Sequence, residues 1–129
     1  MADGGRPDEA RFDQYSRYRQ VAEILASLPG GEGGSVLDAG SGRERLLPRL
    51  LPRREVTCLD PVLAGAEGRE RGVIPSTFAE AELEEGSFDF LTAVDLLEHL
   101  PPAERMPFIE RAGEVARRGL VLTCPCADA

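Results

Sequence analysis

Histidine and cysteine, the residues that most often bind zinc, are scarce in this sequence of 129 residues. It has one histidine and three cysteines, Cys58, Cys124 and Cys126, with no Cys-x-x-Cys pair among them. An odd number of cysteines without paired spacing argues against both a disulfide framework and a zinc site. We therefore expect no bound metal and three reduced cysteines that lie buried in strands.

Positive charge is also scarce, because 15 basic residues face 23 acidic ones and leave a formal net charge of −8. Proteins that bind nucleic acid usually present a basic patch or stripe to the phosphate backbone. A nucleic-acid partner is therefore not expected, and a small-molecule or neutral ligand fits the charge better.

Long apolar runs are absent from the sequence. No run approaches the roughly 20 residues of a membrane span, and residues 1–13 lack the apolar core of a signal peptide. We therefore expect a cytoplasmic protein with no membrane partner. The length and the 42% hydrophobic content predict one globular domain. We expect this domain to span residues 12–129, after a flexible N-terminus of residues 1–11.

A strand, a glycine turn and a helix are predicted over residues 35–51. Val36 and Leu37 form a short apolar run, Gly40 and Gly42 follow it, and leucines then recur at helical spacing. Glycines have no Cβ to keep a ligand from the backbone, and the start of the next helix offers unpaired N–H groups. The stretch therefore predicts a ligand-binding turn.

The spacing of these glycines tests whether the ligand could be a dinucleotide. A dinucleotide fingerprint, Gly-x-Gly-x-x-Gly, needs a third glycine at position 45, where this chain has Arg45. Glu44 would repel a pyrophosphate placed at the start of the helix. A nicotinamide cofactor is therefore disfavoured.

The rest of the chain alternates between helical and strand patterns. Besides residues 35–51, helices are predicted over 12–28, weakly within 62–72 and from Pro107, with Arg117 and Arg118 at the C-terminal end of the last one. Strands are predicted over 55–60, within 73–79 at a sheet edge, over 88–95 and over 120–124. This alternation predicts an α/β fold, a Rossmann-like doubly wound parallel sheet of order 3-2-1-4-5 with helices on both faces.

Two side chains are candidates for chemistry on this sheet. Asp60 ends the second strand, twenty residues after Gly40, where a carboxylate can accept both hydroxyls of a ribose. His99, the only histidine, is a candidate general base near neutral pH, and an equal alternative is that it packs or caps at a strand-to-helix junction. Glu98 and Asp95 are alternative bases that the sequence does not rank.

Two stretches resemble class I S-adenosylmethionine-dependent methyltransferases, in particular the small-molecule, type 11-like members. Asp38, Gly40 and Gly42 match the first motif, an acidic residue before Gly-x-Gly-x-Gly, with Glu44 in place of the third glycine. The second stretch, Gly86 to Pro102, keeps the phrase Gly-Ser-Phe-Asp, an apolar strand, Leu-Glu-His and a proline.

The resemblance implies S-adenosylmethionine as cofactor. His99, chosen as the only histidine, would then be the catalytic residue where the acceptor must lose a proton. Asp38, Gly40, Gly42 and Asp60 would hold the cofactor. Glu80 would face the adenine amine, unless it belongs to a solvated acidic loop with Glu82, Glu84 and Glu85. The backbone at Asp95 and Leu96 would border the methionine end. From the first helix Tyr15, Tyr18 or Arg19 would touch the cofactor, unless both tyrosines only pack at the edge of the core.

The implied reaction is methyl transfer to a small-molecule acceptor, whose nucleophile is left open among oxygen, nitrogen and carbon. Members of the family usually add a helix and a two-strand hairpin after the fifth strand, which this sequence lacks. We therefore expect a C-terminally truncated domain or a homodimer that covers the exposed fifth strand. The alternative function is a non-catalytic binding or interaction module of the same fold.

Overall fold

The computed structural model describes residues 7–28, 34–65 and 72–124 of the chain. A five-stranded sheet of order β3-β2-β1-β4-β5 forms its centre, and every neighbouring pair is parallel. The strands are β1 (Val36–Ala39), β2 (Val56–Leu59), β3 (Val73–Ile74), β4 (Phe88–Val94) and β5 (Ala116–Thr123). The predicted strand order and the edge position of the third strand are confirmed.

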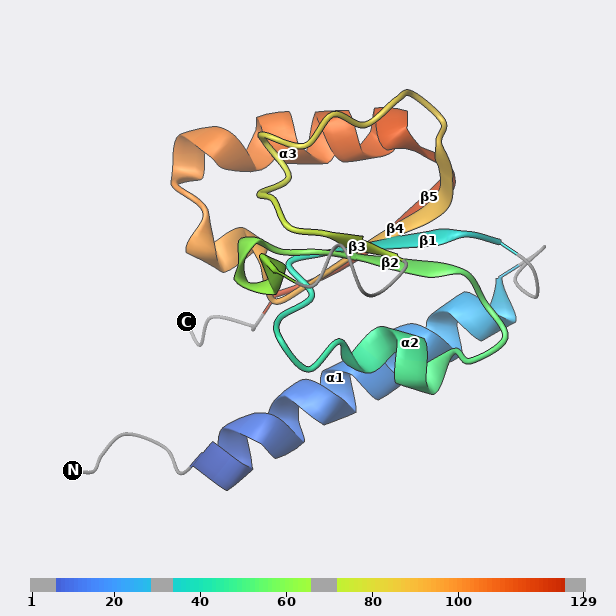
Figure 1. Ribbon diagram of the computed structural model, residues 1–129, viewed down its shortest axis with the longest axis vertical. Helices are drawn as coiled ribbons and strands as arrows, with labels where there is room; N and C mark the ends of the chain where they lie inside the picture. The colour runs from blue at the N-terminus through green and yellow to red at the C-terminus, as the bar shows by residue number, and fades with distance from the viewer. Residues whose placement is uncertain (1–6, 29–33, 66–71, 125–129) are drawn as a thin grey trace.

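Helices cover both faces of the sheet, as predicted (Figure 1). The helices α1 (Pro7–Ser27) and α2 (Leu46–Leu50) lie on one face, and α3 (Pro102–Val115) lies on the other. Two short 3-10 turns, η1 (Pro61–Leu63) and η2 (Leu97–His99), follow β2 and β4. Among the described helices, none combines the length and the apolar character that crossing a membrane requires.

The core divides into two clusters because successive strand residues point to opposite faces of the sheet. Val36 and Phe90 join the cluster beneath α1 and α2, whereas Leu37 and Leu91 join the cluster beneath α3. The first cluster is completed mainly by Tyr18, Val21, Leu25 and Leu47, and the second by Phe78, Phe108, Ala112 and Val115.

Three predicted boundaries near the ends of the chain were wrong. The helix α1 begins at Pro7, five residues before the predicted start. The helix α3 begins at Pro102, and Pro107 lies inside it. An interior proline leaves the carbonyl four residues earlier unpaired, and here Ala103 is exposed, so that water can solvate its carbonyl.

The strand β5 begins at Ala116, directly after α3, and not at Leu120 as predicted. Arg117 and Arg118 therefore belong to the strand and do not end the helix. Both guanidinium groups lie near the Asp89 carboxylate, at 3.0 and 3.5 Å. This pairing explains how two charged residues are accommodated at the start of a strand.

The predicted burial of the cysteines holds only for Cys58 in β2, because Cys124 is exposed. Cys126 lies outside the described residues. The weak helix predicted within 62–72 is represented by η1 alone, and residues 66–71 also lie outside the described part. Pro48 stands in the first turn of α2, as the sequence requires.

Candidate functional site

The loops that follow β1, β2 and β4 meet at one edge of the sheet, on the left of Figure 1. The loop after β1 contains Gly40 and Gly42, whose φ angles are 77° and 75°. Residues with a Cβ seldom adopt this left-handed conformation, which explains the two glycines. The Gly40 N–H donates to the Leu59 carbonyl at 2.7 Å and so fixes the turn against the end of β2.

Asp60 and the glycine turn are directly connected. The Gly42 N–H donates to Asp60 Oδ2 at 3.0 Å, and the Val62 N–H donates to Oδ1 at 3.0 Å. A carboxylate offers about four acceptor positions, so the two oxygens keep room for further donors such as hydroxyl groups. The structure therefore brings together Gly40, Gly42 and Asp60, which were chosen from the sequence as cofactor-binding residues.

Asp38 lies beneath the turn with its side chain fully buried. Its carboxylate accepts hydrogen bonds from the Tyr18 hydroxyl at 3.0 Å and from the Thr92 hydroxyl at 2.8 Å. Burial raises the pKa of Asp38 to about 7, the two hydrogen bonds oppose this rise, and the charge of Asp60 adds to it. Burial and the nearby Asp38 likewise raise the pKa of Tyr18. This geometry turns the Asp38 side chain toward α1, where it connects the helix to β1 and β4.

Asp95 follows β4 with a φ of 55°, an unusual value for a residue other than glycine. Its carboxylate lies 2.8 Å from the Arg17 guanidinium of α1 and accepts a hydrogen bond from the Thr123 hydroxyl at 3.1 Å. The next residue, Leu96, packs so closely on Gly40 that a Cβ built there would lie 3.0 Å from its side chain. The backbone at Asp95 and Leu96 therefore adjoins the glycine turn.

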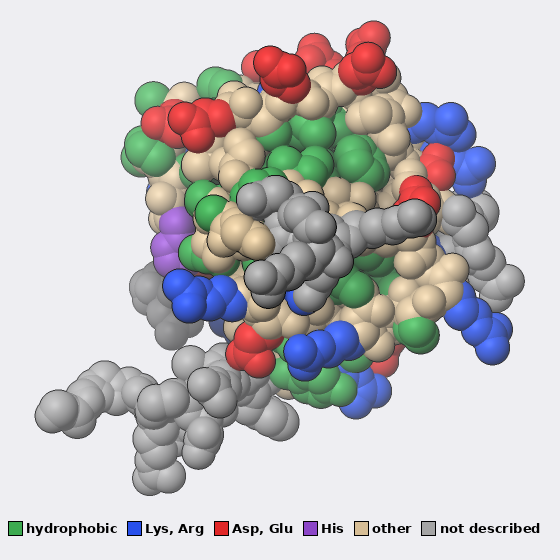
Figure 2. Space-filling model, in the orientation of Figure 1, with side chains coloured by type: hydrophobic (Ala, Val, Ile, Leu, Met, Phe, Trp, Pro, Cys, Tyr) green, Lys and Arg blue, Asp and Glu red, His purple; other side chains and the backbone are tan. Residues whose placement is uncertain are grey.

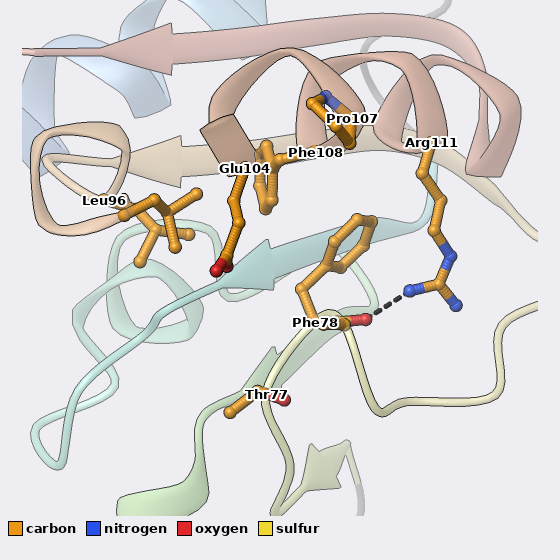
Figure 3. Close-up of a pocket in the computed structure, with 9 residues that line it drawn as sticks. Thr77, Phe78, Leu96, Glu104, Pro107, Phe108 and Arg111 are labelled. Carbon is orange, nitrogen blue, oxygen red and sulfur yellow. Dashed lines mark hydrogen bonds between the residues drawn. The ribbon is translucent and has the colours of Figure 1, made fainter. Parts of the chain in front are cut away.

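A cavity of about 490 Å³ opens beside Leu96, between the chain after β3 and the helix α3 (Figure 3). Its lining is mostly apolar and comprises Thr77, Phe78, Ala79, Leu96, Leu100, Glu104, Pro107, Phe108 and Arg111. The rings of Phe78 and Phe108 pack with their centroids 4.6 Å apart. A cavity of this size and character suits a flat, largely apolar group.

Of the residues chosen from the sequence, Leu96 lines this cavity, and three others lie apart from both the cavity and the glycine turn. Glu80 is exposed, and its Oε1 accepts a hydrogen bond from the Thr77 hydroxyl at 3.2 Å. His99 has 74% of its side-chain surface exposed, with Glu98 Oε2 3.8 Å from its Nε2. Tyr15 is 41% exposed and lines a separate hollow between α1 and α2.

Sequence reasoning missed Glu104 and Arg111, which contribute the two charged side chains among the lining residues. Glu104 lay before the predicted start of the last helix at Pro107, and Arg111 lay within that helix. A helix start at Pro102 would have placed Glu104 in the first turn, next to the edge where the loops meet. Arg111 offered no comparable signal, because its hydrogen-bond partners are backbone carbonyls.

Solved structures share this fold over nearly the whole chain. The magnesium protoporphyrin IX methyltransferase of Synechocystis, with bound S-adenosylmethionine, matches with 21% identity and a TM-score of 0.70 over 94% of this chain and 64% of its own. The 1,6-didemethyltoxoflavin-N1-methyltransferase of Burkholderia thailandensis matches with 24% identity and a TM-score of 0.59, over 91% and 62%. The phosphoethanolamine N-methyltransferase 1 of Haemonchus contortus matches with 22% identity and a TM-score of 0.65, over 90% and 27%.

At these identities the structures establish the fold, and the chain spans less than two thirds of the length of each of the three proteins. No curated protein matches the sequence. The family model of the methyltransferase domain matches residues 11–112, which is most of the chain. This chain therefore belongs to the methyltransferase domain family.

Proposed function

We propose that this chain binds S-adenosylmethionine and transfers its methyl group to a small-molecule acceptor. The observation that supports this most strongly is the hydrogen bond from the Gly42 N–H to Asp60, which joins the glycine turn after β1 to the carboxylate after β2. One ligand can contact a bare turn and a hydroxyl acceptor at the same time only where the two lie side by side.

The residues around the turn fit this cofactor. A Cβ built at Gly42 would meet no atom within 4 Å, so there is open space beside the turn for the methionine part of the cofactor. Asp60 would accept the ribose hydroxyls, and the apolar cavity beside Leu96 would take the adenine ring. Tyr15 and Glu80 have weaker support as cofactor contacts, because neither lines the cavity and, among the described residues, neither is hydrogen-bonded to the glycine turn. Asp38 would act through Tyr18 and Thr92 by fixing the strands beneath the turn.

The cofactor supplies an activated methyl group on a sulfonium, so the protein has mainly to align the acceptor with it and exclude water. We propose His99 as the general base for acceptors that must lose a proton, and its exposure leaves it accessible to such an acceptor. The named neighbours methylate small molecules, and this supports a small-molecule acceptor here.

Three further parts of the proposal concern the setting of the protein. A cytoplasmic location is supported by the odd number of cysteines and their lack of paired spacing. A homodimer through β5 is supported by the position of this strand at the end of the sheet order. The absence of a nucleic-acid partner is supported by the net charge of −8. On the face drawn in Figure 2, acidic side chains gather along the side where α3 lies.

Calorimetric titration of the purified chain with S-adenosylmethionine and S-adenosylhomocysteine tests the proposal. We expect micromolar binding, and we expect Asp60→Ala to weaken it by about a hundredfold, because two charge-assisted hydrogen bonds are lost. Glu55→Ala is the matched control, because Glu55 is an exposed carboxylate at the opposite end of the same strand.

A folded chain that binds neither compound would contradict the proposal. Binding without methylation of any acceptor in a screen of amines, phenols and carbon acids would instead favour the non-catalytic module.

A further inference from the structure

Two successive residues of α1 reach acids at the carboxyl ends of two neighbouring strands. The Tyr18 hydroxyl donates to the Asp38 carboxylate in β1. The Arg17 guanidinium lies with its Nε 2.8 Å from Asp95 Oδ2, directly after β4. The strands β1 and β4 are paired, and in Figure 1 the N-terminal part of α1 lies on the side where the loops after them meet. The helix is therefore connected to the strand that leads into the glycine turn and to the neighbour of that strand.

Asp95 is held in a strained backbone conformation by contacts on two sides. Its φ of 55° lies in the left-handed region, which costs energy for residues other than glycine, although aspartate tolerates it better than most. From β5, the Thr123 carbonyl and hydroxyl oxygens accept the Asp95 N–H at 3.0 and 3.1 Å, and the hydroxyl donates to Asp95 Oδ1 at 3.1 Å. From α1, Arg17 pairs with the other carboxylate oxygen. Such a conformation persists only where the surrounding contacts hold it.

The ion pair between Arg17 and Asp95 is built for a local effect. The Arg17 Nη1 donates to the Asp13 carbonyl one turn earlier in α1, at 3.3 Å, which orients the guanidinium. The Arg17 and Asp95 side chains are 33% and 22% exposed, so water and salt screen their attraction. Pairs of this kind contribute little to the stability of a whole chain. The effect of this pair is therefore expected on the conformation of the chain directly after β4.

Leu96 connects the conformation of Asp95 to the candidate site. Its side chain lies so near Gly40 that a Cβ built on this glycine would be 3.0 Å away, and it also lines the cavity beside α3. A change in the backbone angles of Asp95 would redirect Leu96, because the two residues are consecutive. Arg17 is not among the described residues that line the cavity, so its influence on the site passes through Asp95 and Leu96.

We propose that Arg17 is a positioning residue for the cofactor, because its ion pair with Asp95 fixes the backbone after β4. That backbone in turn keeps Leu96 against Gly40. This inference rests on the proposed function. Without the ion pair, the strained backbone can relax while the chain stays folded. Only the molecules that keep the native backbone conformation then bind, and the apparent dissociation constant rises by the inverse of their fraction.

Calorimetric titration of the chain with S-adenosylhomocysteine tests this role. Arg17→Gln should bind about tenfold more weakly, which corresponds to a binding-competent fraction of about one tenth. Arg17→Lys should recover most of the loss, because an ammonium group can also pair with the Asp95 carboxylate. Arg117→Gln is the matched control, because Arg117 makes the same kind of ion pair, 3.0 Å from Asp89 Oδ1, at the opposite end of the strands. This variant should bind as the wild-type chain does.

A second background distinguishes positioning from direct contact with the ligand. Asp95→Gly removes the carboxylate and lets the backbone adopt a positive φ without strain. In this background Arg17→Gln should change the affinity by less than about twofold, because the interaction it would break is already lost. Where Asp95→Gly binds too weakly to measure, Asp95→Asn serves, since asparagine is uncharged and also tolerates the left-handed region. Equal weakening by Arg17→Gln with and without the Asp95 carboxylate would mean that Arg17 contacts the ligand itself, and would overturn the proposal.

The remaining outcomes separate the inference from the function on which it rests. If Arg17→Gln binds S-adenosylhomocysteine as tightly as the wild-type chain, the inference fails while the function stands. A loss of unfolding stability in urea with an unchanged affinity of the folded variant would likewise assign the ion pair to the fold alone. If the folded wild-type chain does not bind the compound, both the function and the inference fail.

Discussion

The parallel strands all begin on one side of the sheet, called here the amino edge, and all end on the opposite side, called the carboxyl edge. The two edges use aspartate side chains in different ways. At the amino edge, the Asp89 carboxylate accepts the Ser35 N–H at 3.0 Å and lies close to Arg117 and Arg118. At the carboxyl edge, Asp38 is fully buried with only the Tyr18 and Thr92 hydroxyls as partners among the described residues. Asp89 is paired with positive charge, whereas Asp38 lies in a position that opposes its ionisation. We propose that the amino edge serves stability and that the carboxyl edge, which holds the glycine turn, serves binding.

A pair of glycine substitutions provides the largest expected separation of these roles. Gly40 and Gly86 both have positive φ angles, 77° and 67°, so alanine at either position should cost about 1–2 kcal/mol of stability. A Cβ at Gly40 would also lie 3.0 Å from Leu96, whereas one at Gly86 would have its nearest atoms 3.9 Å away. Gly40→Ala should therefore also weaken S-adenosylhomocysteine binding by about tenfold or more. Urea unfolding and calorimetry of both variants measure the two effects, and equal binding by the two variants would contradict the assignment of the turn.

The buried acid gives a second, smaller effect that depends on pH. The pKa of Asp38 rises from 3.8 to about 7 in the folded chain. The folded chain thus retains a proton that the unfolded chain releases in this range, so this group stabilises the fold at low pH and loses that contribution as the pH rises toward 7. Asp38→Asn should therefore reduce the fall in unfolding free energy between about pH 5 and about pH 8 by about 2 kcal/mol. An unchanged slope in urea unfolding would show that Asp38 is ionised throughout.

The smallest effect is expected from the arginines of the amino edge. Arg117 and Arg118 are 57% and 45% exposed, so water and salt screen their attraction to Asp89. Arg117→Ala and Arg118→Ala should each lower stability by less than about 1 kcal/mol and leave cofactor binding unchanged. A large loss of binding in either variant would mean that the two edges are coupled through β4 and β5.

The strands and their order could be predicted because apolar runs and glycine turns are local signals. The run from Phe88 to Val94 is buried on both faces, as its composition requires, and it pairs with β1 at the centre of the sheet. The boundary between α3 and β5 was harder to predict from the sequence. Arg117 and Arg118 suit the C-terminal end of a helix, and they equally suit a strand in which they lie beside an acidic residue. Only the position of Asp89 in the fold distinguishes the two possibilities.

The candidate site was predictable where it depends on glycines and strand ends, and less so where it depends on the packing of α3. Asp60 could be predicted as a site residue because it lies twenty residues after Gly40 in the sequence. In the structure its carboxylate accepts a hydrogen bond from the Gly42 N–H. The cavity depends on the contact of Arg111 with the Phe78 carbonyl, and a backbone partner leaves no mark on the sequence. The same limit separates Glu80 from Glu104, two acids of which only the second lines the cavity.

The direct passage from α3 at Val115 into β5 at Ala116 restricts how relatives of this chain can diverge. A residue inserted there would either reverse which side chains of β5 face the core or turn α3 by about 100° about its axis. The second change would carry Glu104 and Arg111 away from the cavity that they line. Across homologues, the spacing between these two residues and the fifth strand should therefore stay constant even where the residues of the junction themselves change.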